Sequence, residues 1–154
     1  MPNYSRYSVD ELIKAGVKVI IRFKEIFNQI LDGNNDLTDG FKNGMFDEIV
    51  LHPEDKIVID RYGGNFGRFF GAEGTPIEQR AMSPNSDFSS YNKYLVTGDI
   101  PMKKGEIAPW FGTSGGGIQY QIQDDFYTQM MSYANEGEGI IDVLKRLGYL
   151  EVVS

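Results

Sequence analysis

The first part of the chain repeats apolar and polar residues with the period of a helix. Residues 8–11, SVDE, form a capping box, in which a serine caps the first turn and a glutamate reaches back to it. Apolar residues then recur near every third or fourth position as far as Leu31, and Gly33 follows as a stop signal. The pattern predicts one long amphipathic helix over residues 8–32.

Beyond the helix, short apolar runs alternate with turn residues. The segment DGNNDLTDGF (32–41) is rich in acidic residues, but Leu37 and Asn43 replace the glycine and glutamate that a calcium loop requires. We therefore expect a solvated turn there. KIVIDRYGG (56–64) predicts a buried strand, Ile57-Val58-Ile59, that runs into a turn. From there to about residue 123 we expect short strands joined by ordered loops, in alternating runs such as KYLVTGDI (93–100) and GGGIQYQIQ (115–123).

The last thirty residues return to helical spacing. DDFYTQMMSYA (124–134) fits either a short helix or a strand with a loop, because its phase is poor. GIIDVLKRLG (139–148) predicts a short helix that ends at a glycine, and YLEVV (149–153) predicts a closing strand. The fold class is therefore α+β, with an N-terminal long helix followed by a compact β-rich core with short helices.

Composition removes several kinds of chemistry. The sequence has no cysteine and a single histidine, His52, which excludes disulfides, thiolate nucleophiles and histidine-rich metal sites, so no metal site is expected. A formal net charge of −7 argues against nucleic-acid binding. Residues 60–105, however, carry six basic against five acidic side chains, so a small anionic ligand is acceptable there. No signal peptide and no apolar run long enough for a membrane span is recognisable.

The remaining candidates for chemistry are arginines, aromatic residues, glycines and glutamines. Arg61 follows a predicted strand and Arg80 follows a Gly-Thr-Pro turn. Gln119 and Gln121 are two positions apart and share one face of a strand. Taken singly, each has an ordinary explanation, because arginines at strand ends usually form surface ion pairs and glutamines on strands usually face solvent.

Together, these residues resemble a known family. DRYG (60–63), GTPIEQR (74–80) and IAPWFGTSGGGIQYQ (107–121) resemble, in this order, the TNT domain of tuberculosis necrotizing toxin, and the resemblance spans roughly residues 56–153. It implies a TNT or ADP-ribosyltransferase-like NADase fold over 51–154, with 1–50 as a helical lead-in element. It also implies hydrolysis of the nicotinamide–ribose bond of NAD+ or NADP+ as substrate, without a cofactor.

The resemblance assigns roles to individual residues. It implies that Gln119 and Arg61 are catalytic and that Arg80, Phe69 and Asn92 bind substrate. The arginines are expected to hold the pyrophosphate, and Phe69 is expected to make a ring contact. Asn92 stands where the family is expected to have a histidine, and it can form hydrogen bonds but cannot exchange protons near neutral pH. The glycines before Gln119 are expected to let a ligand approach the backbone.

The resemblance also implies a biological setting and leaves alternatives. It implies a secreted or delivered toxin domain that acts in the target-cell cytosol and has a cognate immunity protein. An ADP-ribosyltransferase is one alternative, although the triplet Gln119-Tyr120-Gln121 lacks the glutamate that such enzymes commonly use. A non-catalytic nucleotide-binding or partner-binding module with the same fold is the other.

Overall fold

The structure is a computed structural model that describes residues 39–82, 86–110 and 112–154. The long helix expected over 8–32 lies outside these residues. The division of the chain at residue 50 stays a prediction, and residue 50 itself lies within strand β1. In the ranges described, no helix is long and apolar enough to cross a membrane.

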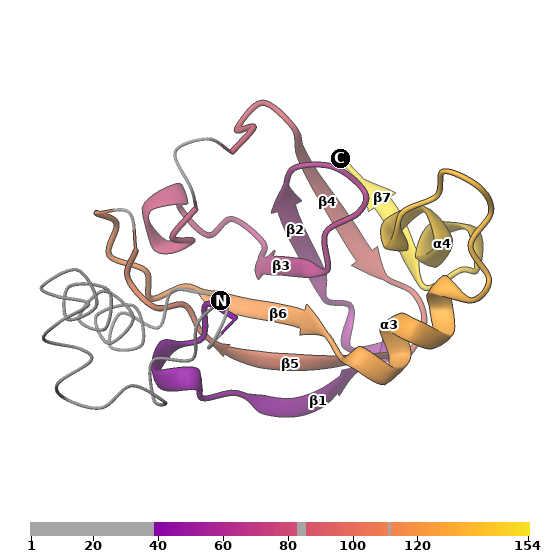
Figure 1. Cartoon of the computed structure of the whole chain (residues 1–154), viewed down its shortest axis with the longest axis horizontal. Helices are drawn as coiled ribbons and strands as arrows, with labels where there is room; N and C mark the ends of the chain where they lie inside the picture. The colour runs from indigo at the N-terminus through magenta and orange to yellow at the C-terminus, as the bar shows by residue number, and fades with distance from the viewer. Residues whose placement is uncertain (1–38, 83–85, 111) are drawn as a thin grey trace, which may run out of the picture.

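The described residues form one seven-stranded antiparallel sheet in the order β1-β5-β6-β3-β2-β4-β7 (Figure 1). Its strands are β1 (Asp47–Leu51), β2 (Val58–Tyr62), β3 (Phe69–Ala72), β4 (Tyr91–Val96), β5 (Ile100–Glu106), β6 (Ile118–Ile122) and β7 (Leu150–Val153). Two helices follow β6, α3 (Asp124–Met131) and α4 (Ile140–Arg146). Short 3-10 turns occupy Lys42–Gly44, Pro53–Asp55 and Ile77–Gln79.

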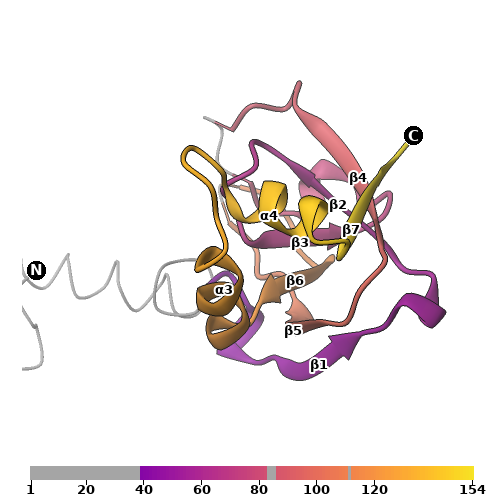
Figure 2. The same ribbon diagram turned by 90° about the vertical axis from the view of Figure 1, so that its right-hand side faces the viewer.

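The two helices lie together on one side of the strands (Figure 2). In α4, the four buried side chains follow helical spacing and join the core under the sheet; they are Ile140, Ile141, Val143 and Leu144. Alternate residues of the central strands complete that core, among them Ile59, Phe70, Tyr94 and Ile122. Burial of these side chains fixes the register of the central strands, because a one-residue slip would turn them outward.

Strands β2 and β3 separate soon after they pair. Their register joins only Ile59 to Ala72 and Asp60 to Gly71, whereas β2 and β4 pair along five positions. Beyond Asp60 the chain runs through the loop of residues 63–68 before it returns as β3. This early separation leaves an opening in the sheet between the end of β2 and the start of β3.

The strands expected in 56–64, 93–100 and 115–123 and the helix in 139–148 are confirmed. The ambiguous segment 124–134 is helical over α3. Strand β1 is an addition to the predicted picture, whereas β3 and β5 lie in the region up to about residue 123 where short strands are expected, in stretches that the pattern did not single out. Strand β5 contains Pro101 and Gly105, residues that individually disfavour strands, and only its pairing with β1 and β6 overrides that preference.

Candidate functional site

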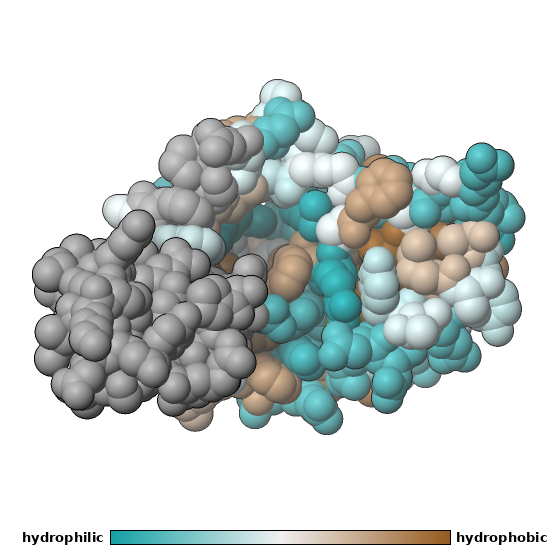
Figure 3. All heavy atoms as spheres, viewed as in Figure 1, coloured by the Kyte–Doolittle hydropathy of each residue, from teal (hydrophilic) through white to brown (hydrophobic). Residues whose placement is uncertain are grey.

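A pocket of about 130 Å³ lies where β2 and β3 separate. It is lined by Arg61, Tyr62, Phe69, Phe70, Gly71, Arg80, Met82, Ile107 and Gln119. The face drawn in Figure 3 is hollowed in this region. Ligand pockets commonly measure about 300–1,000 Å³, so this one is smaller than a typical ligand pocket. Four of the five residues expected at the site, Arg61, Phe69, Arg80 and Gln119, therefore converge here from separate parts of the chain.

Arg61 is a largely buried cation in this pocket. Its Nη1 donates a hydrogen bond to the carbonyl oxygen of Phe69 at 2.8 Å, and its guanidinium lies 6.0 Å from the ring centre of Phe70. Burial lowers the pKa of Arg61, and within the part of the chain that the structure describes the buried Nε has no hydrogen-bond partner. No ion pair to Arg61 occurs among the residues described. A desolvated, unpaired cation of this kind favours an anionic ligand.

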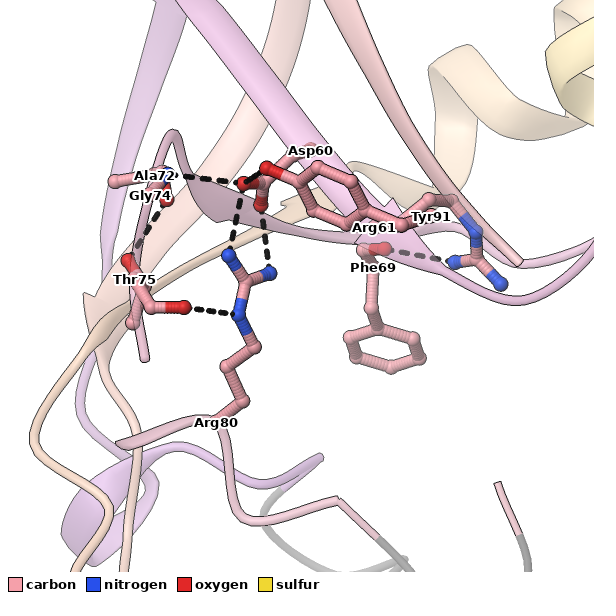
Figure 4. Close-up of polar contacts among 8 residues, drawn as sticks. All are labelled: Asp60, Arg61, Phe69, Ala72, Gly74, Thr75, Arg80 and Tyr91. Atoms are coloured by element: carbon pink, nitrogen blue, oxygen red, sulfur yellow. Dashed lines mark hydrogen bonds and ion pairs between the residues drawn. The ribbon is translucent and has the colours of Figure 1, made fainter. Parts of the chain in front are cut away.

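Arg80, in contrast, is held by a buried carboxylate (Figure 4). Its Nη1 lies 2.6 Å from Oδ1 of Asp60 in an ion pair without hydrogen-bond geometry, and its Nη2 donates to Oδ2 at 2.8 Å. Its Nε donates to the carbonyl oxygen of Thr75 at 2.7 Å. The side chains of Arg80 and Asp60 are 6% and 0% exposed. Arg80 is therefore first a structural cation, and only the remaining N–H groups of its fork are left for a ligand.

Asp60 connects three segments of the chain. Besides Arg80, its Oδ2 accepts hydrogen bonds from the backbone N–H of Gly74 at 3.0 Å and from the hydroxyl of Tyr91 at 2.5 Å. Burial raises the pKa of Tyr91 to about 12, and the hydrogen bond to Asp60 acts in the same direction. The contacts place the turn Gly74-Thr75-Pro76 and strand β4 at fixed positions beside the pocket.

Phe69 and Gln119 complete the pocket from β3 and β6. Phe69 is 37% exposed, and Figure 4 shows its ring extending from β3 on the same side as the Arg80 side chain. Gln119 is paired with Gly71 of β3, and its Nε2 donates to the carbonyl oxygen of Asp39 at 2.8 Å. The amide nitrogen of Gln119 is thus held by the protein, and this contact fixes the orientation of the amide oxygen.

Two residues considered from the sequence lie away from the pocket lining. Asn92 is the register partner of Arg61 on β4, but it is not among the lining residues. His52 caps a turn after β1, where its Nδ1 lies 2.9 Å from Oδ1 of Asp99, and that hydrogen bond raises its pKa. His52 therefore lies outside the residues that line the pocket.

The glycine triplet packs against the protein itself. A Cβ on Gly115 would lie 2.6 Å from backbone atoms of residues 107–108, and one on Gly117 would lie 2.6 Å from Cγ2 of Thr75. The space beside these two glycines is already filled, so the expectation of ligand approach is wrong for them. Their role is to bring the segment 75–79 against the start of β6, which joins the Arg80 turn to the Gln119 strand.

Sequence reasoning missed Asp60, Tyr62 and Tyr91. Asp60 was visible as the first residue of DRYG, but an aspartate beside an arginine suggests a local ion pair, whereas its charged partner, Arg80, is twenty positions away. An acidic residue within the apolar run IVID is the signal that could have identified it, because buried carboxylates require partners. Tyr62 joins the site through its ring, 5.2 Å from the guanidinium of Arg80.

Comparisons with known proteins agree on one family. The sequence model of the family described as tuberculosis necrotizing toxin, TNT, matches residues 51–153. A conidial surface nicotinamide adenine dinucleotide glycohydrolase of Aspergillus fumigatus is 30% identical over 86 residues, which cover 51% of this chain and 35% of that protein. The chain therefore spans about a third of the length of this curated relative.

Solved structures give the same answer. The structure of tuberculosis necrotizing toxin complexed with its immunity factor IFT is similar at a TM-score of 0.51 and 25% identity, covering 73% of this chain and 58% of that one. Rhs1-CT in complex with its cognate immunity protein RhsI1 reaches a TM-score of 0.46 at 14% identity, over 84% and 90% of the two chains, which is too low to support an argument. Because the family model matches two thirds of this chain, the chain belongs to the tuberculosis necrotizing toxin family.

Proposed function

We propose that this protein is an NAD(P)+ glycohydrolase toxin domain. The observation that carries the proposal is the pocket, in which a partly buried arginine without an ion pair among the described residues, an exposed aromatic ring and an oriented glutamine meet. The family, and the name of the Aspergillus relative as a glycohydrolase of nicotinamide adenine dinucleotide, support this substrate. The proposed reaction converts NAD+ and water into nicotinamide, ADP-ribose and a proton, and it needs no cofactor.

This chemistry suits a site without a histidine or a carboxylate pair. The nicotinamide nitrogen carries a positive charge in NAD+ and leaves as a neutral ring, so no general acid has to protonate it. The transition state places positive charge on the ribose, which has to be held in orientation while water attacks. We assign Gln119 to that task, since its amide oxygen can accept a hydrogen bond from a ribose hydroxyl or from the attacking water.

Arg61 is the proposed anchor of the pyrophosphate. Its planar fork is suited to phosphate oxygens, and an anion would compensate a charge that burial leaves unpaired. Phe69 is the proposed stacking partner of a ring of the substrate. Arg80 is proposed to assist with its remaining N–H groups, and Asn92 to act on Arg61 from the neighbouring strand rather than on the substrate directly.

Hydrolysis is favoured over transfer of ADP-ribose to another molecule. Transfer to a hydroxyl or amine generally benefits from a carboxylate that activates the acceptor. In the described part of the chain, no carboxylate lines the pocket, and Asp60, the partner of the lining residue Arg80, is buried and bonded to Arg80, Gly74 and Tyr91. Water is therefore the proposed acceptor.

We further propose a cognate immunity protein for this chain. The support is the complex of tuberculosis necrotizing toxin with its immunity factor. Production of the active domain in a cell that lacks any inhibitor should deplete NAD+ and stop growth, and the gene for the immunity protein should restore growth. A host that tolerates the active domain alone would contradict the proposal.

The experiment that tests the site follows nicotinamide release from NAD+. Gln119→Ala should lower kcat by about 100-fold or more, as expected when a positioned catalytic group is removed. Gln123→Ala is the matched control, because that glutamine directly follows the same strand, at the start of α3, and donates to the carbonyl oxygens of Met102 and Ile49, away from the pocket. Undiminished release by Gln119→Ala, or an equal loss in both variants, would contradict the assignment.

A further inference from the structure

The loop of residues 63–68 lies against the guanidinium of Arg61. A Cβ built on Gly67 would lie 2.3 Å from both Nη atoms and 2.5 Å from Cζ of Arg61. Real Cβ atoms do not approach other heavy atoms this closely, so only glycine leaves room for the guanidinium at this position. Gly63 contributes from the other end of the loop, since a Cβ there would lie 3.0 Å from Nη2. We call the backbone at Gly63 and Gly67 the Arg61 seat.

The loop that forms the seat is fixed to α4. The carbonyl oxygen of Asn65 accepts a hydrogen bond from the backbone N–H of Ile141 at 3.0 Å, and its Nδ2 donates to Oδ1 of Asp142 at 2.8 Å. The two segments are in such close contact that a Cβ on Gly139 would lie 2.3 Å from the Asn65 carbonyl oxygen. The loop therefore has no room to retreat if a side chain is added at Gly67, and the flexible guanidinium has to move instead.

We propose that Gly67 is a positioning residue for the reaction, which acts by holding the Arg61 guanidinium in the pocket. The inference rests on the proposed function, because it takes Arg61 as the substrate anchor. It goes beyond it in assigning the geometry of Arg61 to the seat and to the contact of Asn65 with α4. Among the described residues, the Arg61 guanidinium makes one hydrogen bond, to the carbonyl oxygen of Phe69, so little besides the seat defines its position.

The sequence supplies a matched pair of variants. Neither Gly67 nor Gly64 has a positive φ, so alanine fits the backbone at both, and a Cβ on Gly64 would meet nothing within 4 Å. Gly67→Ala should lower kcat/KM for nicotinamide release by about 100-fold, the loss expected for a catalytic contact displaced by about 1 Å. Gly64→Ala should leave kcat/KM within about twofold of the wild-type value, because it creates no contact.

A double-variant comparison separates positioning from a general structural effect. In the Arg61→Ala background the guanidinium is absent, so adding Gly67→Ala should change kcat/KM by less than about twofold. If Gly67→Ala alone does not fold, Arg61→Ala/Gly67→Ala should fold, because the shortened side chain removes the conflict. A double variant that loses as much activity as the product of the two single losses, or that fails to fold while Arg61→Ala folds, would overturn the proposal.

A readout without substrate keeps this inference distinct from the proposed function. The Arg61 Nε–H group is buried, and its NMR resonance can be assigned by its loss in Arg61→Lys. Gly67→Ala should shift this resonance and speed its exchange with water, whereas Gly64→Ala should leave it unchanged. If the wild-type protein releases no nicotinamide, the proposed function fails, and the resonance alone decides on the seat. An unchanged Arg61 resonance in folded Gly67→Ala would refute the seat.

Discussion

The buried ion pair of Asp60 and Arg80 leads to a prediction on stability. Asp60→Asn keeps the size of the side chain and removes the charge that compensates Arg80. Both side chains are almost fully inaccessible to water, and Asp60 also accepts from Gly74 and Tyr91. The substitution would therefore leave a buried guanidinium without an opposite charge.

The size of the effect follows from burial. Removing one partner of a buried pair typically costs about 3–5 kcal/mol of the free energy of unfolding, a large part of a total of about 5–15 kcal/mol. At about 2 cal/mol/K of unfolding entropy per residue, such a loss lowers the melting temperature by roughly 10 °C or more. An exposed pair provides the contrast, since Lys42 and Glu106 lie 3.1 Å apart with about half of each side chain in solvent.

Urea unfolding followed by circular dichroism measures both effects. Asp60→Asn should lower the free energy of unfolding by about 3 kcal/mol or more, while Glu106→Gln should change it by less than about 1 kcal/mol. The double variant Asp60→Leu/Arg80→Met should recover much of the loss, because it removes both charges from the interior. Equal effects of Asp60→Asn and Glu106→Gln would refute the view that Asp60 holds the site together.

Two further predictions concern the aromatic residues of the site. The raised pKa of Tyr91, about 12 against about 10 in an unfolded chain, means that the folded protein holds this proton more tightly. The free energy of unfolding should therefore fall as pH rises from about 10 to about 12, and Tyr91→Phe should weaken that fall in urea unfolding at each pH; an unchanged slope would contradict the contact with Asp60. Phe69→Ala should raise KM for NAD+ with a loss of stability below about 1 kcal/mol, since the ring is partly exposed, whereas Phe69→Tyr should preserve KM; an unaltered KM in Phe69→Ala would exclude stacking.

Local patterns in the sequence were sufficient for the elements with strong periodicity. The helix α4 and the strand β6 carry regular apolar spacing, and β2 begins within the apolar run Ile57–Ile59; the core selects the predicted faces. Strand β1 could not be predicted in the same way, because a short edge strand obtains its conformation from pairing with β5 along five positions. Long-range pairing of this kind leaves little trace in a local window.

Four of the residues that line the pocket could be predicted from the sequence, but their contacts could not. Arg61, Phe69, Arg80 and Gln119 were identified through the family resemblance, and they line one pocket. The sequence did not show that the two arginines have different partners: Arg80 is paired with Asp60, whereas Arg61 has no ion pair among the described residues. That difference depends on tertiary structure, because Arg80 is twenty positions away from Asp60 in the sequence.

The glycines illustrate the same limit. A run of three at 115–117 suggested a surface open to ligand, but Gly115 and Gly117 make contact with the protein's own backbone and turn. The isolated Gly67 received no role from the sequence, yet it contacts the guanidinium of Arg61. Which neighbour a glycine admits is a property of tertiary structure, since the residue itself carries no side chain to indicate a partner.

The central claim is that this pocket hydrolyses NAD+, and a mass balance of the products tests it most directly. Purified protein is incubated with NAD+, and NAD+, nicotinamide, free ADP-ribose and protein-bound ADP-ribose are measured over time. The account predicts that nicotinamide and free ADP-ribose form in equal amounts as NAD+ disappears, and that Gln119→Ala lacks this activity. Absence of nicotinamide release, or ADP-ribose recovered on protein instead of free in solution, would contradict it.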